Sequence, residues 1–78
     1  MSVPPLQPAS RKALALIRAS GTVVVDADLP TSDLMVLAGA AAQWGAAMTV
    51  RKAHLRSEET LEEIAAAGRG HVTFDLAE

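Results

Sequence analysis

The most constraining feature of the sequence is the stretch 48–76, which has the pattern strand, helix, strand. The first five and the last five residues of the stretch alternate apolar and polar side chains, which is typical of strands that bury one face. Ser57 is a good helix N-cap, because its hydroxyl can accept a hydrogen bond from an amide of the first turn. Gly68 and Gly70 are expected to end the helix through the positive φ that a C-cap needs. Two strands joined through a helix are expected to be parallel.

The preceding segment predicts a helix over 9–20, a strand over 22–27 and a second helix over 33–44. Gly21 and Gly45 stand just past the two helices, where glycine is favoured. The second helix is expected to be capped by Thr31 or Ser32. The side of the first helix that we expect to be buried carries four apolar residues: Ala13, Leu14, Leu16 and Ile17.

The chain also contains an imperfect internal repeat, because residues 21–46 resemble a looser copy of 47–70. The alignment that we derive from the sequence matches Val24–Leu29 with Val50–Leu55, and Val72 would begin a third copy. Repetition at roughly 25–27 residues lies in the range of short βα solenoid units.

These elements predict an α/β fold with a small three-stranded parallel sheet and the order α-β-α-β-α-β. We expect a flexible lead over 1–8 and a single domain over 9–78. Parallel strands covered on both faces are continuously apolar, whereas these strands alternate, so helices are expected mainly on one face. The alternative is an open doubly wound order in which the first helix covers the second face.

Composition limits the core and the compartment. The 78 residues include no cysteine and only two aromatic side chains, Trp44 and Phe74, so the core is thin and disulfides or thiolate metal sites are excluded. The sequence has no apolar run approaching the ~20 residues of a membrane span and no secretory h-region before its prolines. We therefore predict a cytoplasmic protein without membrane partners.

The net charge of −2 is unevenly distributed. The charge is +3 over residues 1–20, zero over 21–56 and −5 over 57–78. No basic stripe dominates, so direct nucleic-acid binding is not expected.

Two aspartates in the pattern D-x-D raise the question of catalysis. The segment 23–31, with Asp26 and Asp28 after an apolar strand, superficially resembles the first motif of haloacid-dehalogenase-type phosphotransferases. That motif expects Thr or Val where this chain has Pro30, and the family needs further motifs on a much longer chain. We interpret Asp26 as a strand-face residue and Asp28 as a turn residue, and we predict no enzymatic activity, cofactor, metal or small-molecule substrate.

The run L-x(n)-L-x-x-I-A-A-A-G-x-G-x-V-T-F-D over Leu55–Asp75 resembles short solenoid-like βα repeat units of bacterial proteins of poorly defined role. With the looser first copy, the resemblance covers residues 21–75. It implies a scaffold or interaction role and brings no catalytic residues.

Three surfaces are therefore candidates for binding a protein partner or a second copy of the chain, as a dimer or a stacked oligomer. The first is the open strand face, with Val24, Asp26, Thr49, Arg51, His71, Thr73 and Asp75. The second is the acidic helix face, with Glu58, Glu59, Glu62 and Glu63. The third, for self-association, combines basic residues of the first helix with apolar residues of the second: Arg11, Lys12, Arg18, Val36, Ala40 and Trp44.

The main functional hypothesis is a non-enzymatic protein–protein interaction or self-association module. The alternative is a small acidic inhibitor of the kind that phages use against host nucleic-acid machines such as CRISPR complexes, since short, cysteine-free acidic chains are typical of that group. Its carboxylates would occupy a basic groove meant for phosphate.

Overall fold

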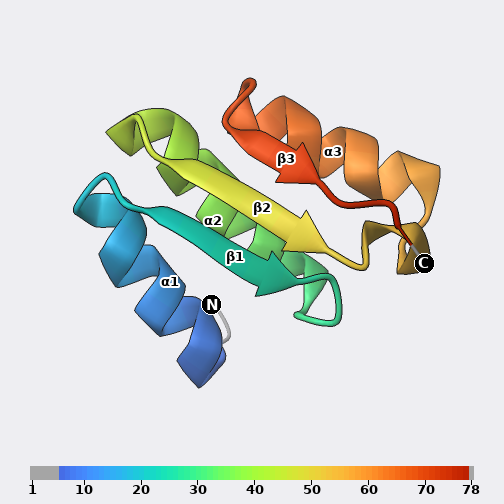
Figure 1. The fold of residues 1–78 in the computed structure, drawn as a ribbon, viewed down its shortest axis with the longest axis horizontal. Helices are drawn as coiled ribbons and strands as arrows, with labels where there is room; N and C mark the ends of the chain where they lie inside the picture. The colour runs from blue at the N-terminus through green and yellow to red at the C-terminus, as the bar shows by residue number, and fades with distance from the viewer. Residues whose placement is uncertain (1–5, 78) are drawn as a thin grey trace, which may run out of the picture.

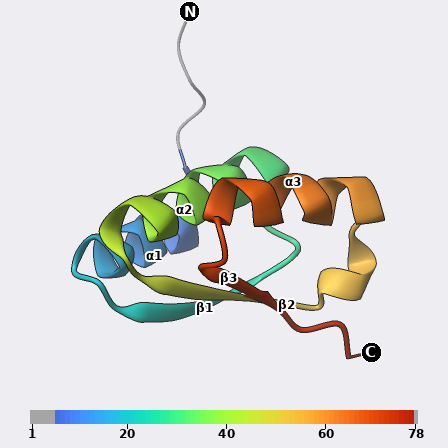
Figure 2. The ribbon, with the colours of Figure 1, turned by 90° about the horizontal axis from the view of Figure 1, so that it is seen from above.

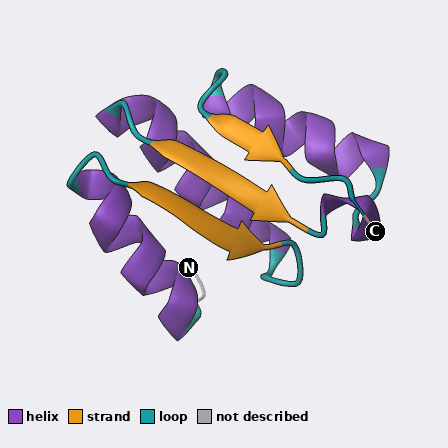
Figure 3. Ribbon diagram, in the orientation of Figure 1, coloured by secondary structure: helices purple, strands orange, loops and turns teal. Residues whose placement is uncertain are grey.

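The computed structural model describes residues 6–77, and the predicted lead over 1–8 therefore lies mostly outside the described residues. The fold class is as predicted, an α/β fold with one three-stranded parallel sheet (Figure 1; Figure 3). The elements in chain order are α1 (Pro8–Arg18), β1 (Thr22–Asp26), α2 (Thr31–Trp44), β2 (Ala47–Arg51), a short 3₁₀ helix η1 (Ala53–Leu55), α3 (Glu58–Gly68) and β3 (Val72–Phe74). Within the described residues, every helix is too short or too polar to span a lipid bilayer.

The strands lie side by side in chain order, β1-β2-β3. Successive right-handed crossovers between neighbouring parallel strands place every connecting helix on the same side of the sheet. Figure 2 shows this arrangement: the helices form one layer above the sheet, and none of those in residues 6–77 lies below it. The prediction of helices mainly on one face is confirmed, and the alternative with α1 over the second face is wrong.

The helix layer is wider than the sheet. Helix axes pack about 8–10 Å apart, whereas neighbouring strands lie about 4.7–4.9 Å apart. The two outer helices must therefore project past the outer strands. Accordingly, α1 packs on α2 and lies beside β1, while α3 packs on α2 and lies beside β3 (Figure 1).

The core lies between the two layers. Its largest fully buried side chains are contributed by all three helices and the central strand: Ile17, Leu34, Leu37, Met48, Val50 and Ile64. Leu16, which the sequence placed on the buried side of α1, is 56% exposed. The buried stripe of α1 is instead formed by Ser10, Ala13 and Ile17.

The strand register corrects the repeat alignment. Thr22 pairs with Ala47 and Met48 pairs with Val72, so the structural offset is 25 residues in the first pair and 24 in the second. The partner of Val24 in the register is therefore Thr49, whereas the alignment derived from the sequence matches Val24 with Val50. Since a shift of one residue exchanges the two faces of a strand, the alignment derived from the sequence had matched an exposed valine with a buried one.

The helix ends follow the sequence signals only in part. Ser57 caps α3 by accepting a hydrogen bond from the Thr60 amide at 3.3 Å, and Gly45 ends α2 with a φ of 66°, both as predicted. The residues with positive φ after α3 are Arg69, at 50°, and Gly70, at 88°. The prediction of a positive φ is therefore confirmed for Gly70 and wrong for Gly68. A Cβ at Gly68 would lie 2.3 Å from Cγ2 of Val72; glycine is needed there because β3 approaches the helix closely.

The predicted side-chain cap of α2 is wrong, because Pro30 occupies the N-cap position and no side chain caps the helix. Two long-range contacts hold this region instead. Asp33 is 4% exposed, and its carboxylate accepts hydrogen bonds from the Gln7 amide at 3.0 Å and the Ser10 hydroxyl at 2.9 Å. The buried carboxylate thus fixes the N-terminus of α1 to α2.

The second contact is made by the Arg56 guanidinium, which follows η1. It donates to the carbonyl oxygen of Ala27 at 2.6 Å, to the hydroxyl of Thr31 at 3.2 Å and to the carbonyl oxygen of Leu29. Arg56 therefore fixes the loop between β1 and α2 to the segment that follows β2.

Candidate functional site

The surface of the sheet that faces away from the helices, called the bare face below, consists of three rows of three side chains. Parallel strands carry residues of one face at every second position, and the register sets the positions within the strands side by side. His71 and Asp75 flank β3 and continue its alternation, since the Met48 amide donates to the His71 carbonyl oxygen and the Asp75 amide donates to the Val50 carbonyl oxygen. None of the nine residues is buried. The rows, from the N-terminal to the C-terminal ends of the strands, are Thr22, Ala47 and His71; Val24, Thr49 and Thr73; and Asp26, Arg51 and Asp75.

All seven residues that the sequence assigned to the open strand face therefore lie together on the bare face. The signal that located them was the alternation of the three strands. Thr22 and Ala47 complete the surface, and the same alternation could have found them.

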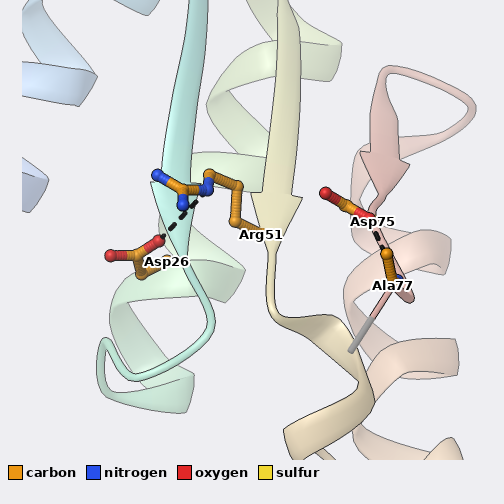
Figure 4. A network of polar contacts seen from close by, with 4 residues as sticks. All are labelled: Asp26, Arg51, Asp75 and Ala77. Atoms are coloured by element: carbon orange, nitrogen blue, oxygen red, sulfur yellow. Dashed lines mark hydrogen bonds and ion pairs between the residues drawn. The ribbon is translucent and has the colours of Figure 1, made fainter.

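The charged row lies at the C-terminal ends of the strands. Nε of Arg51 lies 3.9 Å from Oδ1 of Asp26 (Figure 4). Asp75 turns toward its own chain end, where Oδ1 accepts a hydrogen bond from the Ala77 amide at 3.0 Å. Exposed pairs of this kind contribute only about 0–1 kcal/mol to stability, so the row is not explained by folding energy.

The opposite row carries His71, which is half-buried. Its Nδ1 lies 2.8 Å from the carbonyl oxygen of Ala46, and because a carbonyl oxygen only accepts, Nδ1 carries the proton. His54, by contrast, is exposed in η1. Among residues 6–77, no three histidine, aspartate or glutamate side chains gather as a metal site requires.

A groove runs along one margin of the bare face, between α1 and β1. It has a volume of about 560 Å³ and is called the α1 groove below. Val24 and Leu16, which are 60% and 56% exposed, are large apolar side chains of β1 and α1 that line it. The full lining also includes Ala9, Lys12, Ala13, Val23, Val25, Asp26, Asp28, Leu29 and Arg51.

The sequence did not reveal this groove. Leu16 was assigned to the core, although Ala9, Lys12 and Leu16 fall at the spacing i, i+3, i+7 of a separate helix face. That second stripe was the available signal. Its importance depends on the position of β1, which only the tertiary structure gives.

The acidic helix face is as exposed as its composition suggests. Glu58, Glu59, Glu62 and Glu63 all lie at the surface of α3. No carboxylate of α3 forms an ion pair within the described part of the chain. The acidic helix is separated from the basic α1 by α2, so the two charged helices occupy opposite sides of the molecule (Figure 1).

The residues assigned to self-association are divided between two helices. Arg11, Lys12 and Arg18 are exposed on α1. Val36 and Trp44 are 44% and 46% exposed on α2, whereas Ala40 is half-buried against the core. These residues stay a prediction as an interaction surface.

Comparison of the chain with models of known protein families, with curated proteins and with solved structures finds no match to any of the three.

Proposed function

We propose that the protein is a non-enzymatic interaction module that binds another protein through the bare face. The observation that carries this proposal is a parallel sheet that leaves one face uncovered. Parallel sheets almost always have both faces covered, and here the exposed face presents valine, threonine and a charged row instead of a second helix layer. Contact with a partner would supply the missing cover.

The size of the bare face limits the area and the stability of the interface that it can form. Its nine positions are fewer than the roughly 20–30 residues that each partner contributes to a standard interface. The α1 groove adjoins the bare face and enlarges the available surface, since Val24, Asp26 and Arg51 belong to both. We therefore expect a small, reversible interface.

A photo-crosslinking amino acid at Thr73, in the cells that produce the protein, tests the proposal. Thr73 is exposed at the middle of the bare face, and we expect a discrete adduct with one protein. The same group at Ser32, exposed on α2, is the control. The Thr73 adduct should disappear when Thr49→Arg places a bulky charge in the same row. Equal adducts at Thr73 and Ser32, or an adduct that Thr49→Arg leaves intact, would contradict the proposal.

A second function, an acidic phage-type inhibitor, is favoured by one observation: the four glutamates of α3 are all exposed, on a helix that α2 separates from the basic α1 (Figure 1). In that function α3 would enter a basic groove of a host nucleic-acid-binding complex. Charge reversal at Glu59, Glu62 and Glu63 should then abolish inhibition of such a complex and leave the Thr73 adduct unchanged. Inhibition that survives the reversal would exclude this mechanism.

A further inference from the structure

We propose that the outer edge of β1, which lies in the α1 groove, binds an extended segment of a partner protein as a fourth strand of the sheet. The proposal deepens the proposed function, on which it rests, by naming the binding mode and the chemistry of the ligand. Addition of a strand to an open sheet edge is an established mode of peptide recognition, in which backbone hydrogen bonds supply affinity.

The backbone of β1 has unused hydrogen-bonding groups in the groove. The amide of Ala27 donates to the carbonyl oxygen of Arg51 at 2.9 Å, so residues in step with Ala27, including Val23 and Val25, direct both backbone groups toward β2. The intervening Thr22 and Val24 direct theirs away from the sheet. Within residues 6–77, neither the amide nor the carbonyl oxygen of Val24 forms a backbone hydrogen bond with a turn, loop or helix cap.

Side chains on both sides of this edge suit an extended peptide. On the helix side, Ala9, Lys12 and Leu16 form the wall of the groove. On the sheet side, Val24 projects onto the bare face. A strand paired with β1 directs alternate side chains to opposite faces, so a peptide in this position would place one apolar residue against Leu16 and the next beside Val24.

The helix layer excludes a second folded copy from the same position. A copy that extended the sheet would bring its β3 to within about 4.7–4.9 Å of β1, and its own α3 projects past that strand just as α1 projects past β1 (Figure 1). Two helices need about 8–10 Å between their axes, so the two projecting helices would occupy the same space. A single extended segment carries no helix and avoids this collision.

Charge further specifies the ligand. The lining of the groove includes Lys12 and Asp28, and neither forms an ion pair within the described range. Asp26 and Arg51, by contrast, pair with each other at 3.9 Å. The bound segment therefore carries apolar residues at alternate positions, together with one acidic and one basic residue that meet Lys12 and Asp28.

The probe for the test is a library of random peptides displayed on phage and selected on the full chain. Enriched sequences should show the alternating apolar pattern with adjoining opposite charges, and their synthetic versions are then titrated against variants. Val24→Pro removes one outward N–H and is tolerated at a sheet edge. Val24→Thr keeps that N–H and a branched side chain, and serves as the matched control.

We expect Val24→Pro to weaken peptide binding at least about tenfold, whereas Val24→Thr retains it. Leu16→Asp should also abolish binding, because it places a charge in the apolar wall. Hydrogen exchange followed by NMR supplies a second measurement. In the free protein the Val24 amide should exchange much faster than the Val25 amide, and the bound peptide should protect it.

Several outcomes would overturn the inference: no enriched peptide, peptides that bind the folded Val24→Pro variant normally, or a Val24 amide that is already protected in the free protein. A dimer in solution that Val24→Pro dissociates would show that a second copy is the occupant. Peptides that instead contact α2 near Trp44 would refute the groove and leave the interaction module standing. A partner crosslinked at Thr73, together with no peptide binding, would support binding through the bare face and overturn the addition of a strand at β1.

Discussion

Two glycines in helices show how single residues act in opposite ways in this fold. Gly39 lies inside α2, and a Cβ there would meet nothing within 4 Å. Gly68 is the last residue of α3, where the added atom would lie 2.3 Å from Cγ2 and 3.2 Å from Cβ of Val72. Only Gly68 has a structural reason to be glycine, and that reason is the close contact with β3.

Alanine substitution should therefore change stability with opposite sign at the two positions. Gly39→Ala is expected to raise the free energy of unfolding by about 0.5–1 kcal/mol, because alanine is the better helix former. Gly68→Ala gains a similar propensity term but overpacks the contact with β3, which costs roughly 1–3 kcal/mol, so it should destabilise on balance. Urea unfolding of both variants measures the difference. A stabilised Gly68→Ala variant would show that β3 does not approach α3 this closely.

At the scale of elements, connections between distant segments hold the molecule as much as the elements themselves do. Arg56 joins the segment after β2 to the loop after β1 through the carbonyl oxygens of Ala27 and Leu29 and the hydroxyl of Thr31. Asp33 similarly fixes α1 to α2 through Gln7 and Ser10. Both side chains belong to loops or helix starts, far in sequence from what they bind.

We expect Arg56→Lys to lower the free energy of unfolding by about 1–3 kcal/mol, because an ammonium group cannot reproduce the planar set of donors and leaves a part-buried acceptor unsatisfied. Arg18→Lys, at an exposed position of α1, is the matched control and should change stability by no more than about 0.5 kcal/mol. Thermal or urea unfolding provides the measurement. Equal effects of the two substitutions would mean that the Arg56 contacts contribute nothing specific.

The elements themselves were predictable from the sequence, and these connections were not. Alternation located the three strands, and Ser57 as an N-cap located the start of α3, because those signals are local. Asp33 begins the helix predicted over 33–44, and nothing in that local pattern indicates that its carboxylate binds Ser10 of α1. Leu16 read as core, although the stripe with Ala13 and Ile17 leaves it outside. In each case the deciding neighbour lies on another element, so no local pattern contains it.

At the scale of the whole molecule, one layer of helices over a narrow sheet determines how the protein can associate. The outer helices project past the sheet and prevent its continuation by a second copy. The bare face alone offers nine positions, too few for a stable homodimer by the standard of about 20–30 residues per partner. The basic α1 and the acidic α3 lie on opposite sides, where only weak, screened attraction between copies is available.

The isolated protein should therefore sediment as a monomer at both low and high ionic strength. Analytical ultracentrifugation over a range of protein concentrations measures this. An oligomer that dissociates as salt is added would indicate association of α1 with α3 of another copy. An oligomer insensitive to salt would indicate contact through the apolar surface of α2 around Val36 and Trp44.

The alternation of inward and outward side chains along each strand has a consequence for how this fold could diversify. In each strand, the residues at alternate positions pack against the helices, and the residues between them face outward. Mutations at the outward-facing positions can therefore change the exposed surface of all three strands without changing any valine or methionine that packs against the helices. Related chains could keep one framework and acquire different ligands, and a combinatorial library restricted to the outward-facing positions should yield folded proteins with new specificities.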